Sequence, residues 1–415
     1  MEAPGLDPSL PILGHGALAA VHLLTESPTP PEPVATTTDG PTIAVKVVSK
    51  ALLVALQQVD AIFREKRALE AVALKSSSPF VVTFMRARQD ADTVYLYMQA
   101  VLASSSASLD LRAVLDAHFV PLPLDATRCL ARCVSSALLH IHSHGVAHRD
   151  VKPGNICLDA TGKPVVVDFG CARQFEVSSE GSISLVGTLP YMAPEVLARC
   201  GHACEADWWS LGVLLVECLS GCVTGCDLLF EGDDDDPAEA NDPALQRSDS
   251  VETPRRRQWT HPEIADAHAR GITAAGAAIT ARKLAAILPA DADDKSTSSL
   301  TCFVLASLQH EPIPRAAAAV DWAAQNQPPE PPTRVTQEPV DTSDEHGYAS
   351  LRSIVAGTVA GRCTMSDVTA SEDEEEAAWA AAEREELLSR ANDVWRRTAD
   401  GWRSTFDEFG PFIHA

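Results

Sequence analysis

Four polar side chains near the middle of the chain have the types and the spacing that phosphate chemistry needs. Asp150, Lys152 and Asn155 lie in one short stretch, and Asp168 directly follows the apolar run from Val165 to Val167. A hard divalent cation prefers oxygen ligands, and a transferring phosphate needs positive charge beside it. A carboxylate at the end of an apolar strand suits a ligand better than a structural residue. The alternative interpretation is that Asp150, Asn155 and Asp168 are ordinary turn residues.

A buried lysine is predicted upstream, together with a helix that supplies its partner. The segment Ile43-Ala44-Val45-Lys46-Val47-Val48 is typical of an apolar strand and contains one lysine. Because an unpaired ammonium is costly to bury, Lys46 must find a carboxylate. Glu65 follows Ile62 by three residues and precedes Leu69 by four, so the three share one face of a helix. We expect a Lys46–Glu65 ion pair; the alternative is a solvated Glu65 among its basic neighbours.

Two closely spaced glycines precede these elements, in Leu13-Gly14-His15-Gly16-Ala17-Leu18-Ala19-Ala20-Val21. Glycine lets a backbone turn tightly and come close to a phosphate. Alone, this pattern fits a tight turn equally well. Its meaning therefore depends on the motifs that follow it.

Taken together, these motifs resemble the signature of the eukaryotic protein kinases. The segment His148-Arg149-Asp150-Val151-Lys152-Pro153-Gly154-Asn155 resembles the catalytic loop, and Asp168-Phe169-Gly170 and Ala193-Pro194-Glu195 follow it in the family's order. The glycine loop matches the family pattern except that Ala19 replaces its third glycine. The resemblance implies an α+β, two-lobed protein kinase fold, with a small β-rich N-lobe and a larger helical C-lobe.

The resemblance also implies a role for each catalytic candidate. Asp150 would accept the proton of the substrate hydroxyl, and Lys152 would lie beside the transferring phosphate. Lys46, positioned by Glu65, would contact the α- and β-phosphates. The implied cofactors are ATP and Mg²⁺. The implied metal ligands are Asn155 and Asp168, and the implied nucleotide-binding residues are Leu13, Gly14, Gly16, Val21, Ala44, Lys46, Met98, Gln99, Val101 and Cys157.

Within the kinases, the chain resembles the AGC group, to which the cyclic-nucleotide-dependent kinases belong. Three stretches carry this narrower resemblance: Glu65 to Leu69, Val94 to Met98, and Asp207 to Leu215. Lys152 and Thr188 are typical of kinases that phosphorylate serine and threonine. We therefore expect a serine/threonine kinase.

The chain departs from the AGC pattern at two positions that bear on the substrate. Gly154 stands where basic-directed AGC kinases carry a glutamate, and Ser105 stands near the expected place of another carboxylate. These positions do not support a preference for basic substrates. The resemblance further implies that Asp207 anchors the catalytic loop and that Arg315 pairs with Glu195.

Two features suggest regulation. Ser184 lies three residues before Gly187, at the AGC activation-loop position, and we expect it to be phosphorylated in the active form. The alternative is a serine-rich solvent loop. The segment Phe406-Asp407-Glu408-Phe409 resembles the F-x-x-F motif with which AGC tails dock onto the helix that carries Glu65. Its alternative role is to cap the preceding helix.

Composition places the chain among globular, intracellular proteins. It has 415 residues, 46% of them hydrophobic, and a net charge of −24, which argues against nucleic acid or an anionic membrane as a partner. No apolar run is long enough for membrane insertion, and the 11 cysteines lack the paired spacings of a zinc site. We expect a cytoplasmic protein, with the nucleus as the other option. The expected partners are protein substrates and an upstream kinase or regulatory subunit.

Domain boundaries follow from the motifs and from shifts in composition. Acidic and Pro-rich stretches interrupt or follow the kinase-like part. The predicted kinase domain covers residues 8–325, divided into an N-lobe at 8–98 and a C-lobe at 99–325 with a disordered insertion at about 227–299; a disordered linker at 326–372 and a C-terminal helix and tail at 373–415 complete the chain.

Three functions compete on this basis. The leading one is an active kinase that transfers the γ-phosphate of ATP to protein serine or threonine. The second is a pseudokinase scaffold, suggested by Ala19 and Cys157 in the nucleotide site and by the large insertion in the C-lobe. The third, a kinase of small molecules, is disfavoured by the complete Ala193-Pro194-Glu195 segment together with Arg315.

Overall fold

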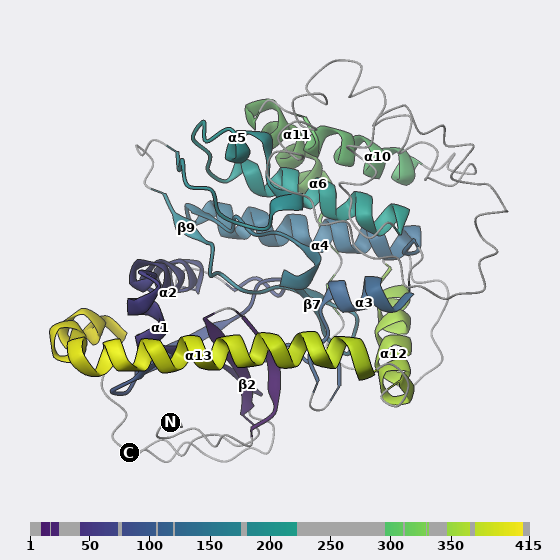
Figure 1. Ribbon diagram of the computed structural model, residues 1–415. Helices are drawn as coiled ribbons and strands as arrows, with labels where there is room; N and C mark the ends of the chain where they lie inside the picture. Colours follow the sequence, from purple (N-terminus) through teal and green to yellow (C-terminus); the bar gives the residue numbers. More distant parts are fainter. Residues whose placement is uncertain are drawn as a thin grey trace, which may run out of the picture.

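The N-lobe of the computed structural model is built on a five-stranded antiparallel sheet with the order β1-β2-β3-β5-β4 (Figure 1). β-branched and aromatic residues dominate its central strands, and β5 is buried at all but its last residue. The register sets Lys46 of β3 opposite Val21 of β2 and Leu96 of β5. The strands are β1 (Ile12–His15), β2 (Ala19–Leu24), β3 (Ile43–Ser49), β4 (Phe84–Gln89) and β5 (Thr93–Gln99).

Two helices follow β3 and lie beside the sheet. α1 (Lys50–Ala55) begins where the Ser49 hydroxyl accepts a hydrogen bond from the Leu52 amide, which satisfies one free donor of its first turn. α2 (Val59–Ala73) buries Ile62, Glu65 and Leu69 on one face, as their spacing predicted. Glu65 is therefore directed inward.

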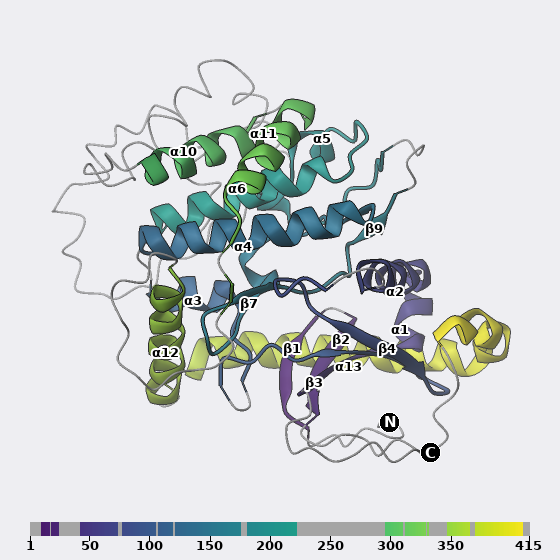
Figure 2. The same cartoon turned by 180° about the vertical axis from the view of Figure 1, so that it is seen from behind.

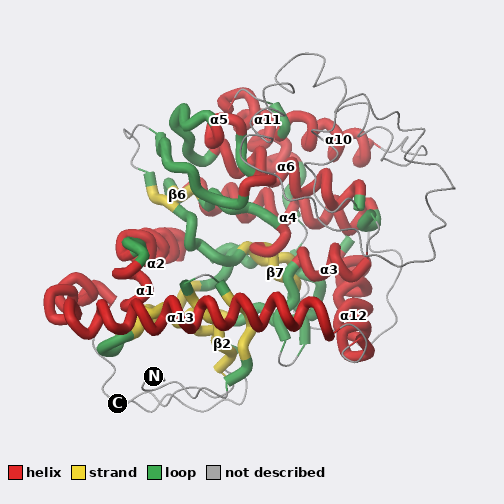
Figure 3. The backbone as a smooth tube through the Cα atoms, in the orientation of Figure 1, coloured by secondary structure: helices red, strands yellow, loops and turns green. Residues whose placement is uncertain are grey.

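The C-lobe is helical, and Figure 3 shows its helices gathered on one side of the N-lobe strands. α6 is buried along nearly its whole length and packs against α4, α10 and α11, so it forms the centre of this lobe. Two short antiparallel pairs, β6 with β9 and β7 with β8, lie where the lobes meet (Figure 2). The helices are α3 (Leu111–His118), α4 (Leu124–Ser143), α5 (Pro194–Leu197), α6 (Glu205–Ser220), α10 (Lys295–Ser307) and α11 (Pro312–Gln325); the strands are β6 (Val146–Ala147), β7 (Ile156–Leu158), β8 (Pro164–Val166) and β9 (Arg173–Gln174).

The predicted α+β fold with two lobes is confirmed. Most of the insertion predicted at about 227–299 lies outside the described residues. The structure describes residues 10–16, 18–24, 42–73, 77–104, 107–118, 121–175, 181–221, 295–309, 312–328, 330–331, 347–365 and 370–409.

A helix occupies part of the segment that was predicted to be a disordered linker, residues 326–372. α12 spans Tyr348–Met365, packs against α3 and α4, and buries Tyr348, Leu351 and Val355. The linker prediction was wrong for this stretch. Small residues surround its few large apolar ones, so the amphipathic pattern is weak and docking on the C-lobe stabilises the helix.

The chain continues into one long helix that reaches the N-lobe. α13 (Ala370–Trp402) runs from the region of α12 past the sheet to α1, against which it packs (Figure 1, yellow). The Trp395 indole N–H donates to Asp92 Oδ1 at 2.8 Å, in the turn between β4 and β5. The C-terminal segment thus contacts both lobes.

The F-x-x-F motif docks on α2. It lies in the 3₁₀ helix η4 (Arg403–Phe409), where the rings of Phe406 and Phe409 pack on Phe63 at centroid distances of 5.9 and 4.9 Å. Both tail phenylalanines are almost fully buried. The alternative role, capping of the preceding helix alone, does not account for these contacts.

Candidate active site

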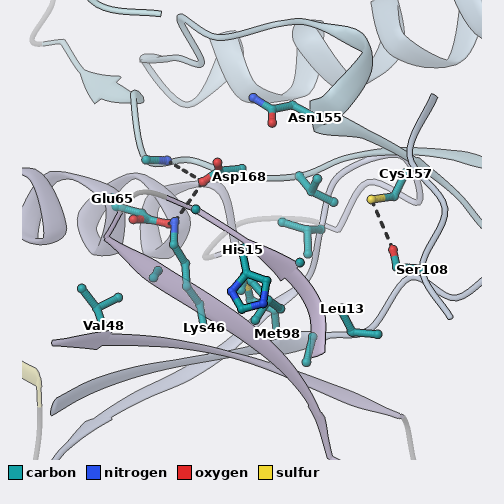
Figure 4. Close-up of a pocket in the computed structure, with 18 of the residues that line it drawn as sticks. Leu13, His15, Lys46, Val48, Glu65, Met98, Ser108, Asn155, Cys157 and Asp168 are labelled. Atoms are coloured by element: carbon teal, nitrogen blue, oxygen red, sulfur yellow. Dashed lines mark hydrogen bonds and ion pairs between the residues drawn. The ribbon is translucent and has the colours of Figure 1, made fainter. Parts of the chain in front are cut away.

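A cavity of about 450 Å³ lies between the sheet and the loops of the C-lobe (Figure 4). The strands of the N-lobe provide its roof and the β7–β8 region its floor. All ten residues that the resemblance implied for nucleotide binding line this one cavity, although they come from five separate stretches of the chain. Asn155 and Asp168 line it as well.

Lys46 is the centre of an ion-pair network inside the cavity. Its ammonium lies 2.6 Å from Glu65 Oε1 and 2.9 Å from Asp168 Oδ1 (Figure 4). Burial alone would lower the pKa of Lys46, but the two carboxylates override it and raise that pKa above its usual value. The predicted Lys46–Glu65 pair is present, and the solvated Glu65 is excluded.

The two carboxylates of this network differ in environment. Burial raises the pKa of Glu65 in spite of the attraction of Lys46. Burial acts in the same direction on Asp168, but the charge and the hydrogen bond of Lys46 prevail and lower the pKa of Asp168 to about 2. Asp168 is therefore ionised throughout the physiological pH range, as a metal ligand must be.

Asp150 is held by three polar side chains. Its Oδ1 accepts a hydrogen bond from the Thr188 hydroxyl at 2.7 Å, and its Oδ2 accepts one from the Asn155 amide at 2.9 Å. The Lys152 ammonium lies 3.0 Å from the same Oδ2 and donates to Thr188 at 2.6 Å. The arrangement fixes the carboxylate and joins the catalytic loop to the segment that contains Thr188.

The backbone of the catalytic loop is anchored by Asp207 of α6. Its two carboxylate oxygens accept hydrogen bonds from the amides of His148 and Arg149 at 2.8 and 2.7 Å. Arg149 and Asp168 both adopt positive φ values, 65° and 58°, which non-glycine residues rarely do. Such strain is typical of functional positions that the surrounding structure holds in place.

Asn155 and Asp168 suit a hard divalent cation. The Asn155 amide nitrogen donates to Asp150, so its carbonyl oxygen is the group left for a metal. Asp168 provides an ionised carboxylate in the same cavity. Two oxygen ligands with space for phosphate beside them match the way Mg²⁺ is bound at nucleotide sites.

The floor of the cavity carries an unusual polar contact. The Ser108 hydroxyl lies 3.6 Å from the Cys157 sulfur, and burial raises the pKa of that thiol to about 11. Cys157 is therefore a neutral, weakly polar group in the lining of this cavity. Nothing in this geometry closes the cavity to a nucleotide base.

Sequence reasoning missed Asp110, which lines the same cavity. Ser105, which stands near the place where the AGC pattern has a carboxylate, lies outside the described residues. Asp110 Oδ1 accepts a hydrogen bond from the Ala113 amide at 2.8 Å, at the start of α3. An aspartate before an apolar periodic segment is a helix-start signal, and it would have located this residue.

Ser184 faces a basic hollow on the other side of the catalytic loop. Its hydroxyl lies 2.6 Å from that of Ser182 and accepts a hydrogen bond from Arg149 at 3.2 Å. Burial lowers the pKa of Arg149 to about 10. The hollow is lined by Arg64, Arg67, Arg149, Arg173, Gln174, Phe175, Ser184 and Val186.

A buried ion pair links α5, which contains Glu195, to α11 of the C-lobe. The Arg315 guanidinium donates to both carboxylate oxygens of Glu195 at 2.7 and 3.1 Å, which links α11 to α5. This is the pair that the resemblance implied. It fixes the segment between Thr188 and Glu195 against the helical core.

Comparison with protein families identifies the class. The family model described as "Protein kinase domain" matches residues 12–316, well over half of the chain. The chain belongs to the protein kinase family.

Individual relatives narrow the class further. The chain is 35% identical to "Protein kinase 2" of Dictyostelium discoideum over 43% of its own length and 35% of that protein. It is 34% identical to "Ribosomal protein S6 kinase beta" of Caenorhabditis elegans over 44% of its length and 32% of that protein. It is also 35% identical to human "cGMP-dependent protein kinase 2" over 43% of its length and 22% of that protein.

The S6 kinases and the cGMP-dependent kinase are serine/threonine kinases of the AGC group, so the predicted resemblance to this group is confirmed. The matched part of the chain spans about a third or less of the length of these relatives.

Among the described helices, none is long and apolar enough to cross a membrane.

Proposed function

We propose that this chain is an active kinase that transfers the γ-phosphate of ATP to serine or threonine hydroxyls of proteins. The observation that carries the proposal is the completeness of the site. Lys46, Asp150, Asn155 and Asp168 are all present, and each has the partners that its role requires.

The chemistry of transfer follows from these positions. Asp150 is fixed by Asn155 and Thr188, so its carboxylate can accept the hydroxyl proton as the substrate oxygen attacks the γ-phosphorus. Lys152 lies beside it and offsets the charge of the transferring phosphate. Asn155 and Asp168 would hold magnesium, which neutralises the phosphate oxygens when bound.

The choice of serine and threonine is supported by the contact of Lys152 with Thr188. These residues are typical of serine/threonine kinases, and here they meet at 2.6 Å. Both residues contact the Asp150 carboxylate, beside which the aliphatic hydroxyl of a substrate would bind.

The decisive experiment measures transfer of labelled γ-phosphate from Mg·ATP to generic protein substrates and to the protein itself. Asp150→Asn keeps the shape and removes the base, so we expect a loss of at least about 100-fold in transfer rate. Transfer that is unchanged in Asp150→Asn would contradict the assignment. The control is nucleotide binding, which this substitution should leave intact.

We further propose that Ser184 is phosphorylated in the active form. Four arginines line the hollow beside Ser184 and form a site for a dianion, and a phosphate on the Ser184 hydroxyl would pair with Arg149, which already donates to it. Ser184→Ala should lower activity by about tenfold or more, and Ser184→Glu should restore part of it. Equal activity of Ser184→Ala and wild type, with no phosphate found at this residue, would refute the proposal.

The second candidate is a pseudokinase scaffold that binds nucleotide or partners without efficient transfer. Ala19 in the glycine loop and Cys157 in the floor of the cavity favour it. Nucleotide binding without any transfer, after an upstream kinase has been supplied, would establish this alternative.

For the kinase and for the scaffold alike, we propose an intracellular protein. The proposal is supported by the eight described cysteines, which are all free thiols.

A further inference from the structure

His202 is a buried histidine that the candidate active site does not use. It lies in the loop between α5 and α6 and is only 1% exposed. Neither of its ring nitrogens has a hydrogen-bond partner among the described residues. Leaving a buried polar group unpaired is costly, so this position calls for an explanation.

The backbone of His202 pairs with the activation segment, residues 181–191. The Ser182 amide donates to the His202 carbonyl at 2.8 Å, and the His202 amide donates to the Ser182 carbonyl at 2.9 Å. The two stretches approach so closely that a Cβ at Gly181 would lie 2.7 Å from the His202 amide nitrogen. A movement of the imidazole out of the core would therefore break this pairing.

Two arginines beside His202 have no carboxylate partner among the described residues. Arg149 and Arg173 both donate to the Ser182 hydroxyl at 3.1 Å, and the other side-chain hydrogen bonds of Arg149 also go to uncharged oxygen atoms. A second proton on the imidazole would add another positive charge to this group. The cavity that Arg149 and His202 both line has a volume of about 10 Å³, which leaves space for about one water molecule.

The carboxylates around His202 already have other partners. Asp207 accepts hydrogen bonds from two backbone amides of the catalytic loop. Both oxygens of Glu195 accept from Arg315, and three polar side chains hold Asp150. The charged groups that face the imidazole from the surrounding elements are Arg149, Asp150, Arg173, Glu195 and Asp207.

We propose that His202 is a pH-sensitive switch that holds the activation segment in place only while its imidazole is neutral. Burial and the charge of Arg149 lower the pKa of His202 below its ordinary value of 6.5, so protonation disfavours the docked segment. The stabilisation is present above about pH 6.5 and is lost as the pH falls below that value toward the lowered pKa.

A consequence for catalysis rests on the proposed function. The activation segment contains Thr188, whose hydroxyl donates to the Asp150 carboxylate. Release of the segment would remove this contact from the catalytic base. Transfer should therefore slow in acid.

The test measures amide hydrogen exchange of residues 181–186 from pH 5 to pH 7.5, corrected for the intrinsic exchange rate at each pH. The protein is first treated with phosphatase, because a phosphate on Ser184 would compensate the arginines. Wild type is compared with His202→Phe and His202→Gln, whose side chains do not ionise. We expect protection in wild type to fall about tenfold or more between pH 7 and pH 5, and protection in both variants to change less than about twofold.

The matched control is His140→Gln, which removes a partly buried histidine of α4 whose pKa is also lowered by burial. Its profile for residues 181–186 should follow that of wild type. Protection that does not change with pH in wild type would overturn the switch, whatever the variants do. The same loss in wild type and in both His202 variants would also overturn it, because another group would then be responsible.

These outcomes are independent of the proposed function, since hydrogen exchange requires no phosphate transfer. Absence of transfer by wild type at pH 7.5, with the acid-dependent loss of protection present, would overturn the proposed function and leave the switch standing.

Discussion

Lys46 shows how one residue depends on partners from distant parts of the sequence. Glu65 lies 19 positions away and Asp168 lies 122 positions away, and both reach the same ammonium. Burying a charge is costly unless it is paired, and the side chains of Lys46 and Glu65 are both largely buried. The network therefore holds β3, α2 and the Asp168 segment together around one cavity.

This network makes a prediction about acid stability. The folded-state pKa of Asp168 lies at about 2, below its ordinary value of 3.8, so its ion pair stabilises the fold above about pH 4. That contribution is lost as the pH falls from about 4 toward 2. In Lys46→Met the carboxylate loses the cation that lowers its pKa, so this pH dependence should become shallower.

The measurement is the urea midpoint of unfolding at a series of pH values below 5. Lys163→Met is the matched control, because Lys163 pairs with Asp159 in a turn outside the cavity, at 3.3 Å. Its pH profile should run parallel to that of wild type. A parallel profile for Lys46→Met as well would show that Lys46 does not set the titration of Asp168.

At the scale of elements, α2 receives the tail on one side and supplies Glu65 to the cavity on the other. The rings of Phe406 and Phe409 in the tail pack on Phe63 of α2. Lys50 of α1 lies 4.9 Å from the Phe406 ring centre. Burial lowers the pKa of Lys50 to about 8. The Arg67–Glu408 ion pair at 3.2 Å is exposed, so aromatic packing provides most of the stabilisation.

Removal of this packing should release the end of the tail. We expect Phe406→Ala to lower the free energy of unfolding by about 3 kcal/mol, since the ring is fully buried. The Val394→Ala change on α13, at a side chain that is 44% exposed, should cost less than about 0.5 kcal/mol. Hydrogen exchange should show lost amide protection in η4 and the adjoining part of α13 for Phe406→Ala only. Equal protection in both variants would contradict the docking.

At the scale of the whole molecule, the C-terminal segment joins the two lobes. α12 packs on the C-lobe, where the Thr358 hydroxyl lies 3.0 Å from His118 Nε2, and α13 packs on α1 of the N-lobe. The turn between β7 and β8 meets α12 so closely that a side chain has no room there. A Cβ at Gly162 would lie 2.5 Å from the Arg352 amide nitrogen.

Gly162→Ala should therefore displace α12. Its φ of +83° adds a cost of about 1–2 kcal/mol for any side chain, beyond the clash itself. Gly357→Ala, within α12 and with no atom within 4 Å of its added Cβ, should instead stabilise by up to about 1 kcal/mol. Thermal unfolding of the two variants should shift in opposite directions. A neutral Gly162→Ala would mean that α12 does not rest on this turn.

The sequence by itself determined which residues form the candidate catalytic centre. Lys46, Glu65, Asp150, Asn155 and Asp168 sit in short motifs whose spacing reflects local constraints: one face of a helix, the end of a strand, a tight loop. Local spacing is what a sequence records directly. The residues of the candidate nucleotide cavity and the class of the protein were predicted from the resemblance to the protein kinases that these motifs carry.

Only the tertiary structure decided which further side chains reach the cavity and where the C-terminal helices lie. The sequence marks Asp110 as a helix start, but only the path of the loop before α3 brings its side chain to the cavity. α12 appeared inside a predicted linker, since its stability comes from burial against α3 and α4. Contacts between distant segments follow from packing, which no local pattern encodes.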